Sequence, residues 1–239
     1  MIGIKSDVGN VRELNEDFYE YFENEDFRVY IIADGMGGHN SGEVASQTAC
    51  KEVLAFIKEN FYEFQDKEEL LRNAFRIANK CILTVSLQNE ESRGMGTTLV
   101  TGLIYNNNIY IANVGDSSCY LKRDSEVIKI TKDHSLVQEL IDLGSISKEE
   151  AKNHPNKNVI TRAIGTSLNV EVDIYKLDYR DNDIYMLCTD GLSNEVDIKE
   201  KMMNILNGNF QSICDGLIEE AKRNGGRDNV TVMLFGGEV

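Results

Sequence analysis

The chain has 239 residues, 41% of them hydrophobic, which is enough to bury the core of one large domain or two small ones. Its 40 acidic and 25 basic residues give a formal net charge of −15, which repels phosphate backbones and anionic membrane surfaces. We therefore expect no nucleic acid partner, and because no apolar run reaches 18 residues we also expect no membrane insertion. Five scattered cysteines without CxxC spacing indicate reduced thiols, and the N-terminus lacks the apolar region of a signal peptide, so we expect a cytoplasmic protein.

The first half of the chain alternates apolar segments with turn residues. FRVYIIADG, residues 27–35, is typical of a strand that ends in a glycine turn. Apolar residues then recur at helical spacing and predict helices over 42–60 and 67–88. Strand-like segments separated by turn residues follow, without an intervening helix, at 97–105, 108–117, 118–123 and 126–131. This run predicts an antiparallel meander.

The next segments combine short helices with further strands. SLVQELIDLG, residues 135–144, predicts a short helix with a glycine beyond its end, and Ser147 and Glu150 form a capping box that opens another. Residues 170–177 and 183–191 are strand-like and predict a second hairpin.

The C-terminal part is expected to be helical over 198–224 and to close with a strand, NVTVMLF, at 229–235. Strands and helices that each occur in runs are typical of an α+β protein with stacked antiparallel sheets covered by helices. No repeat or Gly/Ser-rich linker divides the chain, so we expect one domain over residues 1–239. Because no coiled-coil heptad or obvious apolar patch is present, we expect a monomer.

Three apolar strands end or begin at an aspartate next to a small or polar residue: Asp34 in IIADGMGG, Asp190 in YMLCTDGL and Asp228 in GGRDNVTV. A single Asp-Gly pair is most simply a turn. Three such acids, with one backbone carbonyl, would instead form a hard-oxygen site suited to Mg²⁺ or Mn²⁺ that keeps several waters. The repetition therefore favours a metal site.

Two further segments carry acids, and one carries an arginine. Glu16 and Asp17 lie in RELNEDF, and Asp116 lies in NVGDSS between two strands. Each of these acids could also be a turn residue or a helix cap. Arg12 is poorly explained as a metal ligand, but its planar guanidinium suits two phosphate oxygens, with a surface ion pair as the alternative.

Seven segments together resemble, in order and over nearly the whole chain, the bacterial branch of the metal-dependent type-2C (PPM) serine/threonine protein phosphatases. They are SDVGNVRELNEDF, ADGMGGHNSGEVAS, GMGTTLV, IANVGDSSCYL, ITKDHSLVQELIDLGSISKEEAKNHPNKNVITRAIG, LCTDGLSNEV and GGRDNVTVMLF. The resemblance implies an α-β-β-α sandwich, two antiparallel sheets flanked by helix pairs. It also implies phosphorylated proteins as substrates, among them a cognate serine/threonine kinase and its targets.

The resemblance assigns roles to the acids. Asp34 is similar to the acid that bridges two metals, the carbonyl of Gly35 to a ligand of the second metal, and Asp190 and Asp228 to ligands of the first. Glu16 and Asp17 are similar to acids beside the second metal, acting directly or through its waters. Asp116, with Asp190, resembles a weaker third site found in bacterial members. The implied cofactors are Mn²⁺ or Mg²⁺, two in each active site with a possible weaker third.

The resemblance also identifies Arg12 with the phosphate-binding arginine and residues 132–165, which include Arg162, with a flap that influences substrate access. Two divalent ions can share a bridging water and lower its pKa toward about 7, which supplies hydroxide for in-line attack on a phosphoester. Many eukaryotic relatives carry a histidine where this chain has Met36, so the general acid is either His39 or a metal-bound water. His134 and His154 lie in the flap, where we expect structural roles.

Other classes of phosphatase, and proteins without activity, offer rival interpretations of the sequence. A cysteine phosphatase needs an arginine six positions after its cysteine, and none of the five cysteines has one. Dinuclear phosphoesterases of the calcineurin type use histidine ligands, and this chain has three histidines, none in a GDxHG or GNHE setting. The alternative that remains is a pseudophosphatase or phosphoprotein-binding regulatory module. Because the expected acids and Arg12 are all present, the sequence favours the enzyme.

Overall fold

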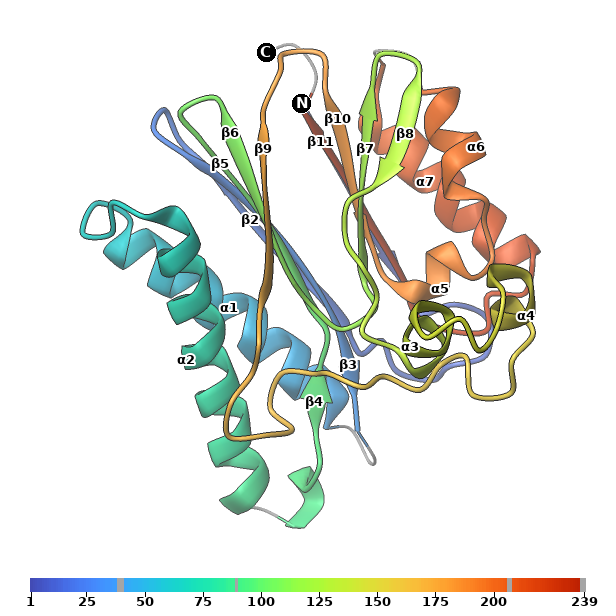
Figure 1. Ribbon diagram of the computed structural model, residues 1–239, viewed down its shortest axis with the longest axis horizontal. Coiled ribbons are helices and arrows are strands. Elements are labelled where there is room, and N and C mark those ends of the chain that lie inside the picture. The colour runs from blue at the N-terminus through green and yellow to red at the C-terminus, as the bar shows by residue number, and fades with distance from the viewer. Residues whose placement is uncertain (38–40, 89, 206–207, 237–239) are drawn as a thin grey trace.

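Two antiparallel β-sheets lie face to face in the computed structural model, which describes residues 1–37, 41–88, 90–205 and 208–236 (Figure 1). The first sheet contains, in spatial order, β1 (Ile2–Asp7), β11 (Val230–Gly236), β10 (Ile184–Cys188), β7 (Ser118–Arg123) and β8 (Glu126–Lys129). The second contains β2 (Asp17–Glu23), β3 (Arg28–Met36), β5 (Leu99–Tyr105), β6 (Asn108–Val114) and β9 (Asp173–Asp178), and the short β4 (Gly96–Thr97) pairs with β3.

Helices cover the outer faces of both sheets (Figure 1). The second sheet is covered by α1 (Gly42–Asn60) and α2 (Lys67–Gln88), and the first by α5 (Asp190–Ser193), α6 (Ile198–Met203) and α7 (Phe210–Arg223). The remaining helical elements are η1 (Glu90–Ser92), α3 (Leu136–Asp142) and α4 (Lys148–Lys152). The expected α+β class and α-β-β-α sandwich are confirmed, as are both long helices, residue for residue, and the capping box at Ser147.

Three apolar layers hold the sandwich together, and the central one lies between the two sheets. In this layer the ring of Phe235, from β11, stacks on Tyr30, from β3, with centroids 3.8 Å apart. Gly102, in β5, leaves space for the ring, because a Cβ there would lie 3.1 Å from Phe235 Cζ. Packing of this kind fixes the separation of the sheets and therefore of any groups at their ends.

Two expected strand pairings are wrong. The meander does not continue from β6 to β7, because β6 pairs with β5 and β9 in the second sheet while β7 pairs with β8 and β10 in the first. The segments at 170–177 and 183–191 do not form a hairpin either, because β9 and β10 belong to different sheets. Both connections cross the sandwich. Neighbouring strands with apolar residues can pair or separate, and local patterning does not distinguish the two outcomes.

The helix expected over 198–224 is interrupted. The side chain of Asn209 accepts hydrogen bonds from the backbone N–H groups of Gln211 and Ser212, at 3.0 and 3.3 Å, and so caps the start of α7. An asparagine that bonds to its own neighbouring backbone favours a helix terminus over a helix interior. The strands β1 and β2 were not expected, since no strong apolar alternation marks either segment.

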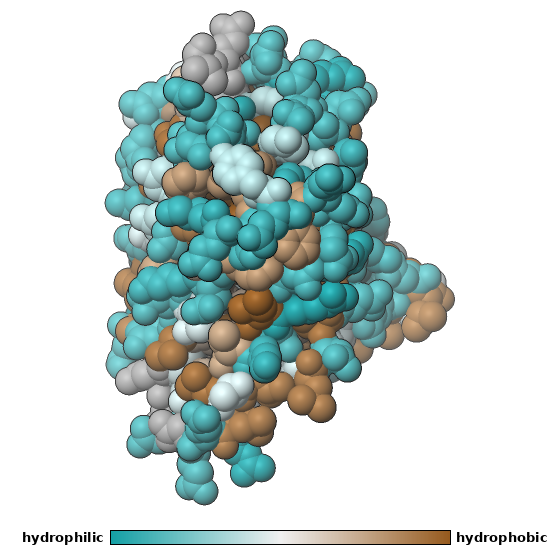
Figure 2. All heavy atoms as spheres, turned by 90° about the vertical axis from the view of Figure 1, so that its left-hand side faces the viewer, coloured by the Kyte–Doolittle hydropathy of each residue, from teal (hydrophilic) through white to brown (hydrophobic). Residues whose placement is uncertain are grey.

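The side of the molecule formed by α1 and α2 faces the viewer in Figure 2. Hydrophilic residues cover most of this face, and hydrophobic residues appear mainly in its lower half. Three residues of α2, namely Ile77, Val85 and Leu87, are among the exposed apolar side chains. No helix in the described parts of the chain combines the length and apolar character needed to cross a bilayer.

The stacked ring of Phe235 gives a test of how the sheets are held together. We expect Phe235→Ala to lower the free energy of unfolding by about 3–5 kcal/mol, because the ring is fully buried and its removal leaves a cavity between the sheets. Urea denaturation followed by circular dichroism measures this loss. Leu168→Ala, at a side chain that is 85% exposed, is the control and should change stability by less than about 0.5 kcal/mol. Equal effects of the two substitutions would contradict this account.

Candidate active site

Acids from both sheets meet at one end of the sandwich. Asp17 begins β2 and faces Asp34 of β3 directly across the ladder. From the other sheet, Asp190 begins α5 just after β10, and Asp228 lies two residues before β11. Asp116 lies in the connection that passes from β6 to β7, between the sheets. The structure therefore brings together five acids that are far apart in the sequence.

The electrostatics of Asp34 show how close these acids are. Burial is the largest cause that raises the pKa of Asp34 well above its usual value, and the charges of Asp17, Asp190, Asp116 and Asp228 raise it further. Each of the four therefore lies within electrostatic range of one carboxyl group. Asp190 is affected in the same way, since burial and then Asp228 raise its pKa to about 6. Hydrogen bonds from Asp34 and from Asn194 partly oppose this rise.

Two of the carboxylates each have a buried oxygen that accepts no hydrogen bond from the residues that the structure describes. Oδ2 of Asp17 accepts hydrogen bonds from the hydroxyl groups of Thr231 and Thr189, at 2.7 and 2.9 Å. Oδ1 of Asp17 and Oδ1 of Asp116 are buried and have no hydrogen-bond partner within the described residues. Burial is also the main cause that raises the pKa of Asp17 to about 7 and that of Asp116 to about 8. Orphaned, electron-rich oxygens of this kind are suited to a cation.

Arg12 and Glu16 complete the edge of the site. Nη2 of Arg12 lies 3.0 Å from Oδ2 of Asp228, and about half of the arginine side chain is exposed. Burial raises the pKa of Glu16. The positive charge of Arg12 and a hydrogen bond from the N–H of Gly42 partly oppose this rise. The ion pair that the sequence left open as the alternative is present, and its partner is one of the site acids. The phosphate-binding role of Arg12 stays a prediction, and the exposed half of its side chain is compatible with that role.

Close backbone approach at Gly35 brings the acid-bearing segments together. A Cβ at Gly35 would lie 2.0 Å from the carbonyl oxygen of Gly42 and 2.7 Å from that of Glu16. The N–H of Gly35 donates a hydrogen bond to the carbonyl of Glu16, at 3.0 Å. Only glycine at this position lets β3, the start of β2 and the start of α1 pack together.

Sequence reasoning missed the polar residues that hold the acids in place. Thr98 Oγ1 accepts a hydrogen bond from the N–H of Asp34, at 2.9 Å, and Thr97 Oγ1 donates to the carbonyl of Asp34, at 2.8 Å. Asn229 Oδ1 accepts from the N–H of Glu16, at 2.8 Å. These residues, like Thr189 and Thr231, lie inside the segments quoted above, and hydroxyl or amide groups adjacent to strand-end acids are the signal that could have found them.

The donor set can be compared with the needs of a divalent metal. In the described portion of the chain, no three His, Cys, Asp or Glu side chains are arranged around one point as ligands of a single ion. Mg²⁺ and ions like it usually take one or two carboxylates and keep several waters, so three converging acids are not required. The two buried orphan oxygens and the mutual repulsion of five acids fit divalent cations. His39, the candidate general acid, lies outside the described residues.

The expected flap lies against this site. A cavity of about 90 Å³ is bordered by Lys157 and Asn158 of the flap and by Gly191, Asn194, Glu195, Arg227 and Asp228. The charge of Lys157 lowers the pKa of Asp190, which places this flap residue within electrostatic range of the acids. A second cavity, of about 290 Å³, is bordered by Asn15, Asp17, Phe18, Glu43, Val44 and Gln47. Two of the acids, Asp228 and Asp17, therefore each border a cavity.

Comparisons with known proteins identify the class to which this fold and site belong. The family model described as protein phosphatase 2C matches residues 10–220. The serine/threonine phosphatase Stp of Listeria welshimeri is 40% identical over 235 residues, which cover 96% of this chain and 93% of that protein. The chain therefore belongs to the protein phosphatase 2C family, and the resemblance seen in its motifs is confirmed.

Solved structures agree with this assignment. The serine/threonine phosphatase of Streptococcus agalactiae has a TM-score of 0.91 and 33% identity, with 100% of this chain and 99% of that chain covered. The catalytic domain of the serine/threonine protein phosphatase PstP, solved in complex with two manganese ions, has a TM-score of 0.86 and 35% identity, with 98% and 96% covered. The fold is thus that of bacterial serine/threonine phosphatases over the whole described chain.

The raised pKa values of the acids predict how stability depends on pH. As pH rises from about 4, the unfolded chain ionises its aspartates first, while Asp17, Asp34 and Asp190 keep their protons in the folded state. The metal-free protein therefore loses stability between the unfolded and folded pKa values, and its Tm should be lower at pH 8 than at pH 5. Saturating Mn²⁺ should raise Tm more at pH 8, by about 5–10 °C at 100 times its Kd.

Calorimetry of a charge variant checks the cause. Without metal at pH 8, Asp34→Asn should melt at a higher temperature than the wild type, because it removes one charge from the repelling group. At pH 5 the difference should shrink. Asp181→Asn, at an exposed turn between β9 and β10, is the matched control and should show no such dependence on pH. An Asp34→Asn protein that is less stable than the wild type at pH 8 would show that repulsion is not the dominant effect.

Proposed function

We propose that this protein is a metal-dependent protein serine/threonine phosphatase that hydrolyses phosphoserine and phosphothreonine monoesters. The observation that carries this proposal is the convergence, at one end of the sandwich, of acids from both sheets, two with orphaned buried oxygens, beside a partly exposed arginine. Membership of the protein phosphatase 2C family and the phosphatase names of its relatives favour the enzyme over a pseudophosphatase.

The residues of the site take the following proposed roles. Asp34, Asp190, Asp228 and the backbone carbonyl of Gly35 would hold two divalent metal ions, with Glu16 and Asp17 beside them, and Asp116, with Asp190, would hold a weaker third. A divalent metal held there would lower the pKa of a bound water and so supply hydroxide for in-line attack on phosphorus. Thr189 and Thr231 keep Asp17 in one orientation, so that its free oxygen can accept a hydrogen bond or bind a cation.

Arg12 would bind the phosphate group. One guanidinium nitrogen is held by Asp228 at 3.0 Å, and the exposed remainder of the fork can donate to two phosphate oxygens. The same contact fixes the distance between the phosphate and an expected metal ligand. Charge that develops on the equatorial oxygens during phosphoryl transfer would be balanced at this position.

Several finer points extend this proposal. We propose two ions of Mn²⁺ or Mg²⁺, with a weaker third, because oxygen donors suit both metals and a relative was solved with two manganese ions. The proposed substrates are phosphorylated proteins, among them a cognate serine/threonine kinase and its targets.

We also propose a cytoplasmic monomer, built as a single domain over residues 1–239 with residues 132–165 as its flap. The general acid stays a prediction, either His39 or a metal-bound water.

Phosphate release from a phosphothreonine peptide tests the function. With Mn²⁺ the wild type should release phosphate, and EDTA should abolish the release. Asp190→Asn should lower kcat by several orders of magnitude with the fold intact, because it removes a proposed metal ligand. Circular dichroism checks that the variant is folded. A wild type that is folded and metal-loaded yet inactive toward several phosphopeptides would favour the pseudophosphatase.

Steady-state kinetics test the role of Arg12. Arg12→Ala should raise KM for a phosphopeptide about 10-fold or more, because a charge-assisted hydrogen bond of about 1.5–3 kcal/mol is lost. Arg12→Lys keeps the charge but loses the planar fork of donors, so its KM should lie between those of Arg12→Ala and the wild type. Arg76→Ala, at an exposed arginine of α2, is the control and should leave KM unchanged. An unchanged KM in Arg12→Ala would assign Arg12 to the ion pair alone.

A further inference from the structure

His134 lies between the turn that carries Asp116 and the end of the flap, and only 7% of its side chain is exposed. Its backbone N–H donates a hydrogen bond to the carbonyl oxygen of Gly115, at 3.0 Å. Its ring Nδ1 accepts a hydrogen bond from the N–H of the same glycine, also at 3.0 Å. One residue therefore binds both backbone polar groups of Gly115, the neighbour of Asp116.

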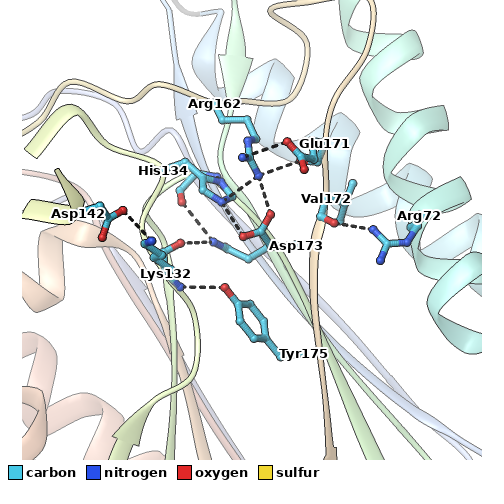
Figure 3. Close-up of polar contacts among 11 residues, drawn as sticks. Arg72, Lys132, His134, Asp142, Arg162, Glu171, Val172, Asp173 and Tyr175 are labelled. Carbon is cyan, nitrogen blue, oxygen red and sulfur yellow. Dashed lines mark hydrogen bonds and ion pairs between the residues drawn. The ribbon is translucent and has the colours of Figure 1, made fainter. Parts of the chain in front are cut away.

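The hydrogen bond from Gly115 determines the tautomer of the ring. Because Nδ1 is an acceptor, the proton of the neutral imidazole is on Nε2. Nε2 lies 3.3 Å from Oδ2 of Asp173, while Nη1 of Arg162 donates to Oδ1 of the same carboxylate at 2.7 Å. Nη1 of Arg162 also lies 3.0 Å from Nε2, but with this tautomer both nitrogen atoms are donors and neither can accept from the other. The two side chains are therefore linked through the carboxylate of Asp173 (Figure 3).

The chain that leaves the flap is bound to the same residue. The N–H of Thr161 donates to the carbonyl oxygen of His134, at 2.8 Å. Two residues after Arg162, Ile164 exchanges backbone hydrogen bonds with Thr97, at 2.9 and 3.0 Å. The Thr97 hydroxyl in turn donates to the carbonyl of Asp34. His134 is thus connected to the backbone of Asp34 by hydrogen bonds together with the covalent chain from Thr161 to Ile164.

We infer that His134 is a positioning residue for Asp116: it clamps the Gly115–Asp116 turn and couples this turn to the flap. The inference rests on the proposed function, in which Asp116 and Asp190 form the weakest metal site. Oδ1 of Asp116 is buried and has no partner among the described residues, so its direction depends on the turn that carries it. If the turn were released, that metal site would become weaker, while the proposed ligands Asp34 and Asp228 would stay in place.

Three substitutions separate the two functions of the ring. His134→Asn keeps an amide oxygen near the position of Nδ1, which can still accept from Gly115, but loses the contact with Asp173. His134→Gln reaches toward Asp173 with its amide group and leaves no acceptor beside Gly115. His134→Ala loses both contacts. If His134→Ala does not fold, the two amide variants still carry the comparison.

Two measurements on metal-free and metal-titrated protein test the inference without relying on turnover. Hydrogen exchange followed by NMR reports protection of the Gly115 amide, and calorimetric titration reports the affinity of each class of Mn²⁺ site. In His134→Gln and His134→Ala we expect faster exchange at Gly115 and an affinity about 10- to 100-fold lower at the weakest Mn²⁺ site, with the tightest site unchanged. His134→Asn should stay close to the wild type in both.

The control variant is Asp142→Asn, which breaks the Lys132–Asp142 ion pair inside the flap without touching Gly115. It should leave exchange and Mn²⁺ binding unchanged. Wild-type Mn²⁺ affinity in His134→Gln and His134→Ala would overturn the inference, as would an equal loss in His134→Asn, which would assign the effect to Asp173. A wild type that shows the expected metal binding but hydrolyses no phosphopeptide would instead contradict the proposed function alone.

Discussion

Asp17 and Asp34 face each other across the β2–β3 ladder, and Asp190 and Asp228 approach them from the opposite sheet. Burial and like charge make this arrangement unfavourable when no cation is present, as the raised pKa of Asp34 shows. The acids cannot move apart, because they lie at the ends of strands whose other residues are fixed by hydrogen-bonded ladders and buried apolar layers. The rest of the sandwich therefore stabilises a site that repels itself and attracts divalent ions.

The distance between the sheets is the second constraint on this site. Tyr30 and Phe235 stack in the central layer, and their packing sets how far the acids of one sheet lie from those of the other. The connections that cross between the sheets, from β6 to β7 and from β9 to β10, therefore also help to position acids of the candidate site. The first of them carries Asp116, and the second leads into β10 and Asp190.

The acids differ in how they are supported. Asp17 is held by two hydroxyl groups, Thr189 and Thr231, from neighbouring strand ends of the same sheet, and no part of this support belongs to the flap. Asp116 is held through Gly115 and His134, and this support includes the flap itself. A movement of residues 132–165 would thus leave the first acid in place and change the surroundings of the second. In the proposed site, the acid that does not contact the flap would therefore stay fixed, and the acid of the weaker third position would respond to the flap.

The sequence by itself determined the local elements and the chemistry: the limits of α1 and α2, the capping box at Ser147, the strand-end acids and the family. These features depend on residues that are close in the chain, so periodicity and motifs contain them. Only the tertiary structure decided which strands pair, because period-2 alternation marks a strand without naming its sheet. The tertiary structure alone also showed that Thr231 donates a hydrogen bond to Asp17, 214 residues away, and that His134 accepts one from Gly115. Hydrogen bonds between distant segments leave no local pattern in the sequence.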